Sequence, residues 1–373
     1  MSKMNWSKRQ WKDVLSIVNG KNQKDVESDE GLYPIIGSGG TIGRAIKYLC
    51  EAGSTVVGRK GTINNPFFVD ERFWNVDTAF GIQPGKSLIP KFLFYFCKGY
   101  NFKKLDKSTT IPSLAKTDLL KIEMPVPSLE EQEKIVNGIE ELFSELDSAV
   151  ETLKKTKEQL AVYRQSVLKD AFSRFSSKEI ILNHSELVTS GSRGWAQYYS
   201  EQGARFIRIT DLTRDRIVLK NDDVQYVALP NNVEGKRSRL MADDILVSIT
   251  ADLGSVALVP ENIEEAYINQ HIALVRLKNP EVAKFIALYL KSDWGQKDLL
   301  RNKRGGGKLG LGLDDIRNTP IPIVSNDVAR KVVSQIESRL TVCDNIEKTV
   351  NETLAQAEAM RQSILKKAFE GNL

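Results

Sequence analysis

Cysteine and histidine are both scarce in this chain of 373 residues. It has three widely scattered cysteines and only two histidines, His184 and His271. An odd, dispersed set of cysteines argues against a disulfide framework and for a reducing compartment, and these residues nowhere show the spacing of metal ligands. We therefore expect a cytoplasmic protein without a metal site.

Long apolar runs are missing as well. The longest candidate, around Phe92–Phe96, is far shorter than the ~20 residues that a membrane helix needs. The first residues, MSKMNWSKRQWKD, lack the apolar core of a secretory signal. Both absences predict a globular protein without a membrane partner, long enough for two to four folding units.

The chain has little net charge, but its positive charge is unevenly spread. The net charge is +5, and residues 1–128 carry 19 lysines and arginines against 12 acidic residues. A second basic run, Lys297–Lys308, has five basic residues and one acid. Such a face suits a polyanion, although charge alone is equally compatible with an ordinary solvated surface.

What the chain does contain is an internal repeat. Residues 164–172 (RQSVLKDAF) and 361–369 (RQSILKKAF) are identical at seven of nine positions, 197 residues apart. Upstream, Pro125-Val-Pro127 corresponds to Pro320-Ile-Pro322. A repeat of this kind sets the organisation of the whole chain. It predicts two globular modules, 1–128 and 179–323, each followed directly by one helical segment, 129–178 and 324–373 respectively.

Both helical segments place apolar residues at alternating steps of four and three, the spacing of a coiled coil. The predicted seam of the first helix is Ile135, Ile139, Leu142, Leu146, Ala149, Leu153, Thr156, Leu160, Tyr163 and Val167. That of the second is Val332, Ile336, Cys343, Ile346, Val350, Ala357, Met360 and Ile364, with Arg339 and Thr353 as polar breaks. Ser128 before two glutamates is a helix start signal. Two matched helices in one chain pair most simply antiparallel, which would hold the modules at opposite ends of a rod with pseudo-twofold symmetry.

The two modules share an order of short strands, glycine-rich turns and one late helix. In the first we expect strands at 53–59 and 76–83 and a helix at 90–98; in the second, strands at 244–250 and 269–277 and a helix at 281–291. A polar loop follows each helix. The predicted fold class is α+β, with two β-rich modules alternating with two long helices paired as an antiparallel coiled coil.

Several motifs resemble those of one known family. The first module contains Tyr33-Pro-Ile-Ile-Gly37-Ser-Gly-Gly-Thr-Ile-Gly43, Val57-Gly58-Arg59-Lys60-Gly61-Thr62 and Phe73-Trp74-Asn-Val-Asp77-Thr78-Ala-Phe80. The second contains Gly191-Ser-Arg-Gly-Trp195-Ala-Gln-Tyr198-Tyr199, Phe206-Ile-Arg208-Ile-Thr-Asp211-Leu and Ile268-Asn-Gln270-His271. These resemble the target recognition domains of specificity subunits of Type I restriction–modification systems. The RQS-(V/I)-L-K-x-A-F helices resemble the spacer regions of that family. The resemblance covers essentially the whole chain, which would be a short member.

The resemblance implies a subunit without catalysis of its own. Each module would read half of an asymmetric, bipartite site in double-stranded DNA, and the helices would set the unread spacer. Two modification subunits would bind S-adenosylmethionine and methylate adenine, and restriction subunits would cleave DNA with ATP and Mg²⁺, so this chain needs no cofactor. Six glutamates of the first helix would form a docking surface for the modification subunits: Glu130, Glu131, Glu133, Glu140, Glu141 and Glu145.

A DNA reader needs donors that hold phosphates and amide or guanidinium groups that face base edges. The candidates in the first module are Ser38, Gly39, Arg44, Arg59, Lys60, Asn64, Lys104, Lys107, Thr109 and Thr110. Those in the second are Arg193, Tyr198, Arg208, Lys236, Arg237, Gln270, Lys303, Arg304 and Lys308. Gly58 and Gly61 flank Arg59 and Lys60, so a turn could present both cations. Arg208 and Tyr198 could equally be buried structural residues.

Two other functions have to be weighed. Asn65-Pro66-Phe67-Phe68 is similar to the Asn-Pro-Pro-Tyr/Phe motif of adenine methyltransferases, but Phe67 replaces the second proline. The glycines of Gly37–Gly43 lack the downstream helix and acidic residue of a nucleotide-binding loop. His271 has no evident serine or cysteine partner. The remaining alternative is a coiled-coil adaptor for proteins without a role on DNA.

Overall fold

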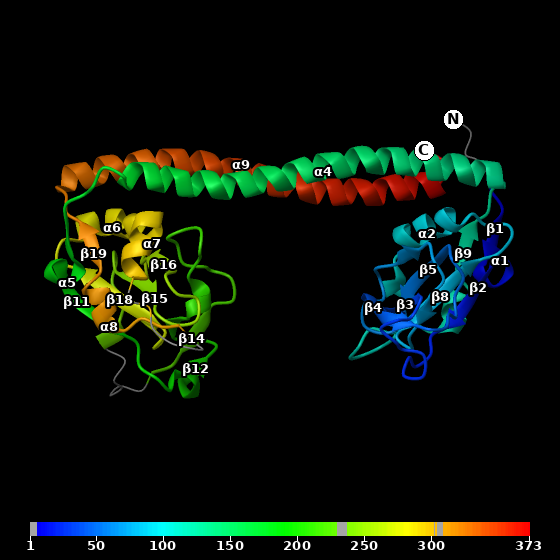
Figure 1. The fold of residues 1–373 in the computed structure, drawn as a ribbon, viewed down its shortest axis with the longest axis horizontal. Helices are drawn as coiled ribbons and strands as arrows, with labels where there is room; N and C mark the ends of the chain where they lie inside the picture. Colours follow the sequence, from blue (N-terminus) through cyan, green and yellow to red (C-terminus); the bar gives the residue numbers. More distant parts are fainter. Residues whose placement is uncertain (1–5, 230–236, 302, 304–308) are drawn as a thin grey trace. The chain divides into compact units, whose positions relative to one another are not determined.

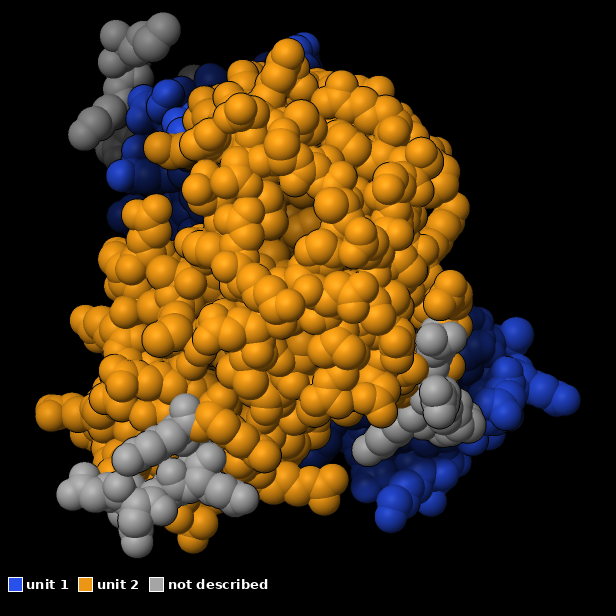
Figure 2. Space-filling view, turned by 90° about the vertical axis from the view of Figure 1, so that its left-hand side faces the viewer, with its two compact units in different colours: residues 1–153, 351–373 blue, residues 154–350 orange. Residues whose placement is uncertain are grey.

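The computed structural model describes residues 6–229, 237–301, 303 and 309–373. It divides into two compact units, residues 1–153 with 351–373 and residues 154–350. Figure 2 colours the first unit blue and the second orange. Each unit consists of one module and parts of two long helices, α4 (Leu129–Phe172) and α9 (Asn326–Phe369). In the described residues, no helix is sufficiently long and apolar to cross a membrane.

The first module is a mixed α/β structure whose strands form small sheets of two to four strands (Figure 1). Its elements in chain order are β1 (Lys8–Gln10), α1 (Trp11–Val14), β2 (Leu15–Asn19), β3 (Tyr33–Gly37), β4 (Gly40–Ala45), β5 (Ser54–Gly58), β6 (Phe67–Val69), β7 (Trp74–Asn75), β8 (Ala79–Pro84), α2 (Pro90–Gly99), the 3₁₀ helix η1 (Phe102–Leu105), α3 (Lys116–Leu119) and β9 (Glu123–Pro125).

The second module follows the same plan with additions. Its elements are β10 (Lys178–Ile180), α5 (Ile181–His184), β11 (Ser185–Ser190), η2 (Trp195–Tyr198), β12 (Tyr199–Ser200), β13 (Ala204–Ile207), η3 (Ile209–Asp211), β14 (Gln225–Val227), β15 (Ile245–Ser248), β16 (Val256–Leu258), β17 (Ala266–Ile268), β18 (Ile272–Leu277), η5 (Pro280–Val282), α6 (Ala283–Lys291), α7 (Asp293–Leu299), α8 (Leu313–Arg317) and β19 (Pro320–Pro322).

The sheets of the two modules have one topology. The main sheet has strand order β2-β8-β5-β6 in the first module and β11-β18-β15-β16 in the second. In the smaller sheet, β3 pairs antiparallel with β4 and parallel with β7, as β13 does with β14 and β17. The small pairs β1-β9 and β10-β19 also correspond. This confirms that the modules share a fold, although β12 and α7 lack counterparts among the described elements of the first.

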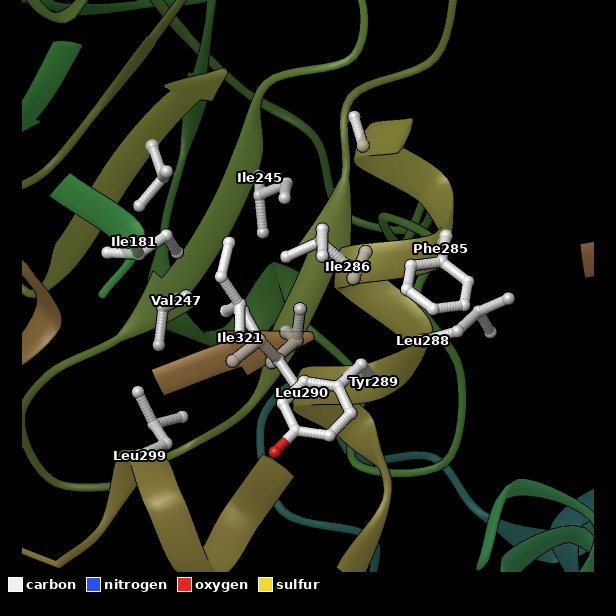
Figure 3. Packing of buried hydrophobic residues seen from close by; sticks show 14 of the residues in the cluster. Ile181, Ile245, Val247, Phe285, Ile286, Leu288, Tyr289, Leu290, Leu299 and Ile321 are labelled. Carbon is white, nitrogen blue, oxygen red and sulfur yellow. The ribbon is translucent and has the colours of Figure 1, made fainter. Parts of the chain in front are cut away.

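Each module has its own apolar core beneath its longest helix. In the second, Ile286 of α6 lies on the side of the main sheet, where Ile245 and Val247 of β15 are fully buried (Figure 3). The rings of Phe285 and Tyr289 pack instead against Phe172 of α4, at 5.2 Å and 5.5 Å. In the first, the residues of α2 that face the core belong to one cluster with residues of both long helices. The central strands β5 and β15 are buried at every residue, so each main sheet is covered on both faces, and the apolar face of one helix supplies part of that cover.

Within each unit, α4 and α9 run antiparallel. In the first unit Arg361 pairs with Asp147, and a Cβ on Gly138 would lie 2.8 Å from the Leu373 side chain. In the second unit Arg339 contacts Asp170 at 3.3 Å, and Arg164 contacts Asp344 at 2.6 Å. Residue numbers on α9 therefore fall as those on α4 rise. The predicted helix start at Ser128 is also confirmed, since the Ser128 hydroxyl accepts from the Glu131 amide at 3.3 Å.

Part of the predicted seam is wrong. Five residues that were expected between the helices are exposed: Leu142, Ala149, Tyr163, Ile346 and Met360. A straight α-helix drifts against a 3.5-residue repeat, and a two-helix pair covers only one stripe of each helix. Near Tyr163 this mismatch turns the next residue, Arg164, toward the partner helix, so Arg164 is buried in place of Tyr163.

Arg164 is the centre of an ion cluster in the second unit. Its guanidinium donates to Asp344 at 2.6 Å and Glu347 at 2.9 Å, both on α9. Arg216, from a loop of the module, reaches the same Glu347 at 3.0 Å. The repeat places Arg361 at the matching position, where it binds Asp147 in the first unit. The repeated RQS segment thus supplies an inter-helix cation in each unit.

Candidate nucleic-acid interface

Backbone hydrogen bonds join separate loops at one end of the first module. The Arg59 amide donates to the Thr78 carbonyl at 2.7 Å, and the Leu114 amide donates to the Arg59 carbonyl at 2.9 Å. Lys60 and Ser113 form an isolated antiparallel bridge. We call residues 37–40, 59–61, 76–78 and 106–114 the first loop cluster. It brings together seven of the ten candidates of this module: Ser38, Gly39, Arg59, Lys60, Lys107, Thr109 and Thr110.

Arg59 and Lys60 leave β5 at a turn that carries them toward solvent. Lys60 is exposed and Arg59 half-buried, with its guanidinium 5.9 Å from the Phe80 ring and 3.4 Å from the Asp77 carbonyl. Gly61 follows with φ of +79°, a conformation that L side chains rarely adopt. The expected role of the flanking glycine in shaping this turn is therefore visible in the backbone.

Ser38 and Gly39 form the two-residue turn of the β3–β4 hairpin. Gly37 pairs with Gly40, which has φ of +126°. No atom lies within 4 Å of a Cβ built on Gly39, so the backbone there is open to a close approach. A Cβ built on Gly61 would be 3.9 Å from the Ser38 hydroxyl, which places this hairpin beside the Arg59–Lys60 turn.

The loop that carries Lys107, Thr109 and Thr110 is held by one carboxylate. Asp106 accepts hydrogen bonds from the Ser108 hydroxyl at 2.6 Å, the Ser108 amide at 3.0 Å and the Ser113 amide at 3.1 Å. These bonds stabilise the charged form and lower the pKa of Asp106. Thr109 and Thr110 are exposed, whereas Lys107 pairs with Asp118 at 2.8 Å while remaining 78% exposed.

Three other candidates of the first module lie outside this cluster. The Asn64 side chain accepts from the Phe102 amide at 2.7 Å and so supports η1. Arg44 donates to the carbonyls of Gly31 at 2.6 Å and Leu32 at 2.8 Å, which ties strand β4 to the loop that precedes β3. Lys104 is an exposed residue of η1. The structure gives Asn64 and Arg44 local structural roles.

The second module repeats the backbone pattern of the first loop cluster. The Ile249 amide donates to the His271 carbonyl, and the Leu311 amide donates to the Ile249 carbonyl, both at 2.9 Å. Thr250 and Gly310 form the bridge. Ile249 and Thr250 therefore occupy the places of Arg59 and Lys60, and His271 that of Thr78. We call residues 249–251, 269–271 and 309–311 the second loop cluster.

Two further features support this correspondence. Ala251 has φ of +55° at the position of Gly61, so both turns pass through the left-handed region. A Cβ on Gly20 would lie 1.7 Å from the Val76 carbonyl oxygen, and one on Gly191 would lie 1.9 Å from that of Ile268. A strained non-glycine residue such as Ala251 is typical of a functional loop. The equivalence was not evident from the sequence because the turns Arg59-Lys60-Gly61 and Ile249-Thr250-Ala251 differ at every position.

Gln270 is the candidate of the second module that lies in its loop cluster. Its amide nitrogen is 3.0 Å from His271 Nε2, and His271 Nδ1 is 2.6 Å from the Thr250 hydroxyl. Gln270, His271 and Thr250 are all half-buried. Gln270 was a candidate from the sequence, whereas Thr250 was missed. Thr250 is recognised only because the backbone places it at the position of Lys60.

The remaining candidates of the second module have varied surroundings. Arg208 donates to the Asp223 carbonyl at 2.5 Å and lies 3.1 Å from its carboxylate, and it also contacts Asp211. Tyr198 packs on the aromatic cluster around Trp195. Arg208 and Tyr198 therefore make structural contacts within the module, which was one of the two alternatives that the sequence left open. Arg193, Arg237 and Lys303 are exposed. Lys236, Arg304 and Lys308 lie outside the described residues.

The features that suggested a methyltransferase are parts of the core and of a hairpin. Phe67 and Phe68 begin β6, and the Phe68 ring packs 5.7 Å from that of Phe94 on α2. Gly37–Gly43 spans the β3–β4 hairpin, so no helix follows it as a nucleotide-binding loop requires. In the described part of the chain, no group of three His, Cys, Asp or Glu side chains could hold a metal ion.

One glutamate of the expected docking surface faces the module instead. Glu140 accepts from Lys91 at 2.6 Å and from the Tyr95 hydroxyl at 3.3 Å, both on α2. Its placement on a free helix face was therefore wrong, because α2 packs over that turn of α4. Glu130, Glu133, Glu141 and Glu145 are exposed.

Known proteins share both the sequence pattern and the fold. The family described as "Type I restriction modification DNA specificity domain" matches residues 3–161 and 206–356. The EcoBI specificity subunit of Escherichia coli is 25% identical over 318 residues, 76% of this chain and 65% of that protein. The EcoKI specificity subunit of Escherichia coli (strain K12) is 22% identical over 355 residues, 87% of this chain and 74% of that protein. The match to EcoBI therefore spans slightly less than two thirds of that relative.

Two solved structures give the same fold at low identity. One, from work on complex assembly and conformational transition of the type I R-M system, has a TM-score of 0.74 at 15% identity over 100% of both chains. The HsdS subunit from Thermoanaerobacter tengcongensis has a TM-score of 0.52 at 16% identity, over 99% of this chain and 98% of that one. Two mixed α/β modules and two packed long helices are common to this fold. With the matched family covering most of its residues, the chain belongs to the Type I restriction-modification DNA specificity family, which is non-catalytic.

Proposed function

We propose that this chain recognises a bipartite, asymmetric DNA sequence on behalf of partner subunits that modify and restrict DNA. Residues 1–128 and 179–323 act as the two target recognition domains, and residues 129–178 and 324–373 as the spacer helices. Each domain reads one half-site through its loop cluster. The adenine methyltransferase and the ATP-dependent endonuclease, with S-adenosylmethionine, ATP and Mg²⁺, belong to other chains in the cytoplasm.

The observation that carries this proposal is the recurrence of one loop cluster in two modules of unlike sequence. The same backbone hydrogen bonds hold Arg59 with Thr78 and Ile249 with His271, whereas the exposed side chains differ. A fixed frame with variable side chains is what two readers of different sequences require. A protein adaptor would not need its polar loops to be matched in this way.

The two loop clusters differ in the charge of the side chains that they present to DNA. Arg59 and Lys60 give the first a cationic turn suited to phosphates or to guanine, whose major-groove edge carries two acceptors. The second presents the polar residues Thr250, Gln270 and His271 at the corresponding place. Affinity therefore depends more on the first cluster than on the second.

The exposed glutamates of α4 are the proposed docking surface for the modification subunits. Glu130, Glu133, Glu141 and Glu145 are exposed, and Glu130 forms an i,i+4 pair with Lys134 on its own helix. An exposed pair of this kind contributes little to stability, so it can exchange for a partner's cation.

The test is a variant with Arg59→Ala and Lys60→Ala, assembled with its modification subunits. We expect the same assembly, slower methylation of the cognate site and weaker duplex binding. Each phosphate contact contributes about 0.9 to the slope of log affinity against log salt, so the slope should fall by up to about 2. Unchanged methylation kinetics and an unchanged slope would refute the assignment of the cationic turn.

A matched control removes the same charge elsewhere. Lys366→Ala with Lys367→Ala deletes two exposed cations from the last turns of α9, distant in sequence from either loop cluster. It should leave methylation unaltered. Binding of S-adenosylmethionine by the isolated chain with micromolar affinity would favour a methyltransferase, and no DNA affinity of the assembled complex would favour the adaptor.

A further inference from the structure

The second loop cluster contains a chain of three side chains that fixes one amide. The Gln270 amide nitrogen lies 3.0 Å from His271 Nε2, and His271 Nδ1 lies 2.6 Å from the Thr250 hydroxyl. Thr250 comes from the turn after β15, whereas Gln270 and His271 come from the β17–β18 turn. The backbone pairing of Ile249 with His271 holds these two turns together.

The hydrogen bonds determine which atoms of each group are used. With the Gln270 amide nitrogen as donor, His271 Nε2 accepts, which is the tautomer with its proton on Nδ1. Nδ1 donates that proton to the Thr250 hydroxyl. The His271 amide also donates to the Asn269 side chain at 3.1 Å, which fixes the turn itself. The ring is thus held on both nitrogens.

The amide of Gln270 keeps its recognition atoms after this contact. A side-chain NH₂ has two protons, so the contact with His271 uses one of them and leaves the other as a donor. The carbonyl oxygen of the same planar amide is an acceptor. That acceptor–donor pair is the one that a glutamine uses to contact N6 and N7 of adenine in the major groove.

We propose that Gln270 is the adenine-specifying residue of the second recognition domain, and that His271, backed by Thr250, positions its amide. The proposal rests on the proposed function and deepens it. Pre-ordering of the amide by His271 removes rotamers that would otherwise be lost on binding. The first domain has Asp77 and Thr78 at these positions and so reads its half-site by different chemistry.

The test compares methylated motifs produced in cells by the chain together with its modification subunits. The wild type should give a bipartite motif with an A·T pair at a defined position of one half. Gln270→Ala should relax discrimination at that pair alone, roughly tenfold to hundredfold. Gln270→Glu should favour cytosine there, because a carboxylate accepts from the cytosine amino group. The half-site read by the first domain should stay the same.

The positioning role of His271 has its own pair of variants. His271→Phe removes the acceptor and should relax discrimination at the same A·T pair. His271→Gln offers an amide oxygen to the same proton and should restore it, which a purely structural role of the ring would not predict. Gln335→Ala, at an exposed position of α9, is the matched control and should leave the motif intact.

The outcomes separate this inference from the proposed function. A bipartite motif that Gln270→Ala leaves unchanged, or relaxes at a G·C pair or in both halves, overturns the assignment of Gln270 while the proposed function stands. Loss of discrimination in both His271 variants overturns the positioning role. If the wild-type complex yields no bipartite motif, the proposed function itself fails.

Discussion

At the scale of single residues, the roles of charged side chains depend on partners far away in the sequence. The turn at Arg59 and Lys60 could be predicted, because the glycines that shape it are adjacent. For Arg208 the sequence left a DNA contact and a structural role open, since its partner Asp223 comes from a loop 15 residues away. Thr250 carried no local signal, because its position is defined only by the pairing of Ile249 with His271.

Lys291 is a buried lysine that the proposed function does not use. It is 5% exposed, and its ammonium donates to the Thr213 carbonyl at 2.7 Å. Burial lowers the pKa of Lys291 from 10.5 to about 8. Between these values the unfolded chain binds more protons than the folded one, so the free energy of unfolding rises with pH in this window and is lowest below pH 8.

We predict that Lys291→Met removes this dependence. From pH 7 to pH 10, the free energy of unfolding of the wild type should rise relative to the variant by about 2 kcal/mol, after allowance for residual solvation. Urea unfolding of both proteins at the two pH values measures the difference. If the difference in free energy of unfolding between the wild type and the variant is the same at both pH values, the lowered pKa of Lys291 is contradicted.

At the scale of elements, the sequence predicted the helices better than their packing. The repeat and the start signals located α4 and α9 well, because capping and periodicity are local. The seam was only partly right, because burial in a two-helix pair also depends on what each module contributes. Glu140 faces Lys91 of α2 rather than solvent for the same reason.

Gln132 shows how one module is attached to its helix. This fully buried residue of α4 donates to the carbonyls of Ser87 at 2.8 Å and Pro127 at 3.0 Å, and accepts from the Ile89 amide at 2.8 Å. Ile89 precedes α2, so Gln132 joins the start of α2 to α4. The repeat has Ala329 at the matching position, so this contact was not predictable from the duplication.

We predict that Gln132→Leu destabilises the chain by about 3 kcal/mol. The substitution preserves volume but removes the partner of one buried and two partly buried backbone groups. A buried polar group costs about 1–3 kcal/mol when unsatisfied, and the partly buried groups cost less. Thermal or urea unfolding of the purified chain gives the value. Gln335→Leu, on an exposed face of α9, should change stability by less than about 0.5 kcal/mol. Equal effects of both substitutions would show that the Gln132 contacts contribute nothing.

At the scale of the whole molecule, the duplication gives one fold two reading surfaces. The order of elements could be predicted for both modules, since strands and late helices follow local patterns. The equivalence of the loop clusters required the backbone hydrogen bonds, because Arg59-Lys60 and Ile249-Thr250 have nothing in common as residues. Fixed frames and divergent loops are what separate selection of the two half-sites would produce.

The helices are proposed to set the distance between the half-sites. Four residues inserted into α4 after Leu153 add about one turn, or ~6 Å, which is close to two base pairs. We predict a methylated motif with a longer unread gap and unchanged half-sites, which serve as the internal control. An unchanged gap, with methylation preserved, would contradict the role of the helices as a ruler.

The central claim is that this chain alone determines which DNA sequence its partners methylate. Sequencing of methylated adenines in host DNA, with and without the gene for this chain, tests it most directly. We predict one asymmetric motif of two short half-sites around a fixed gap, present with the gene and lost without it. Methylation that persists unchanged after deletion, or that depends on the gene but follows a single continuous motif, would contradict the account.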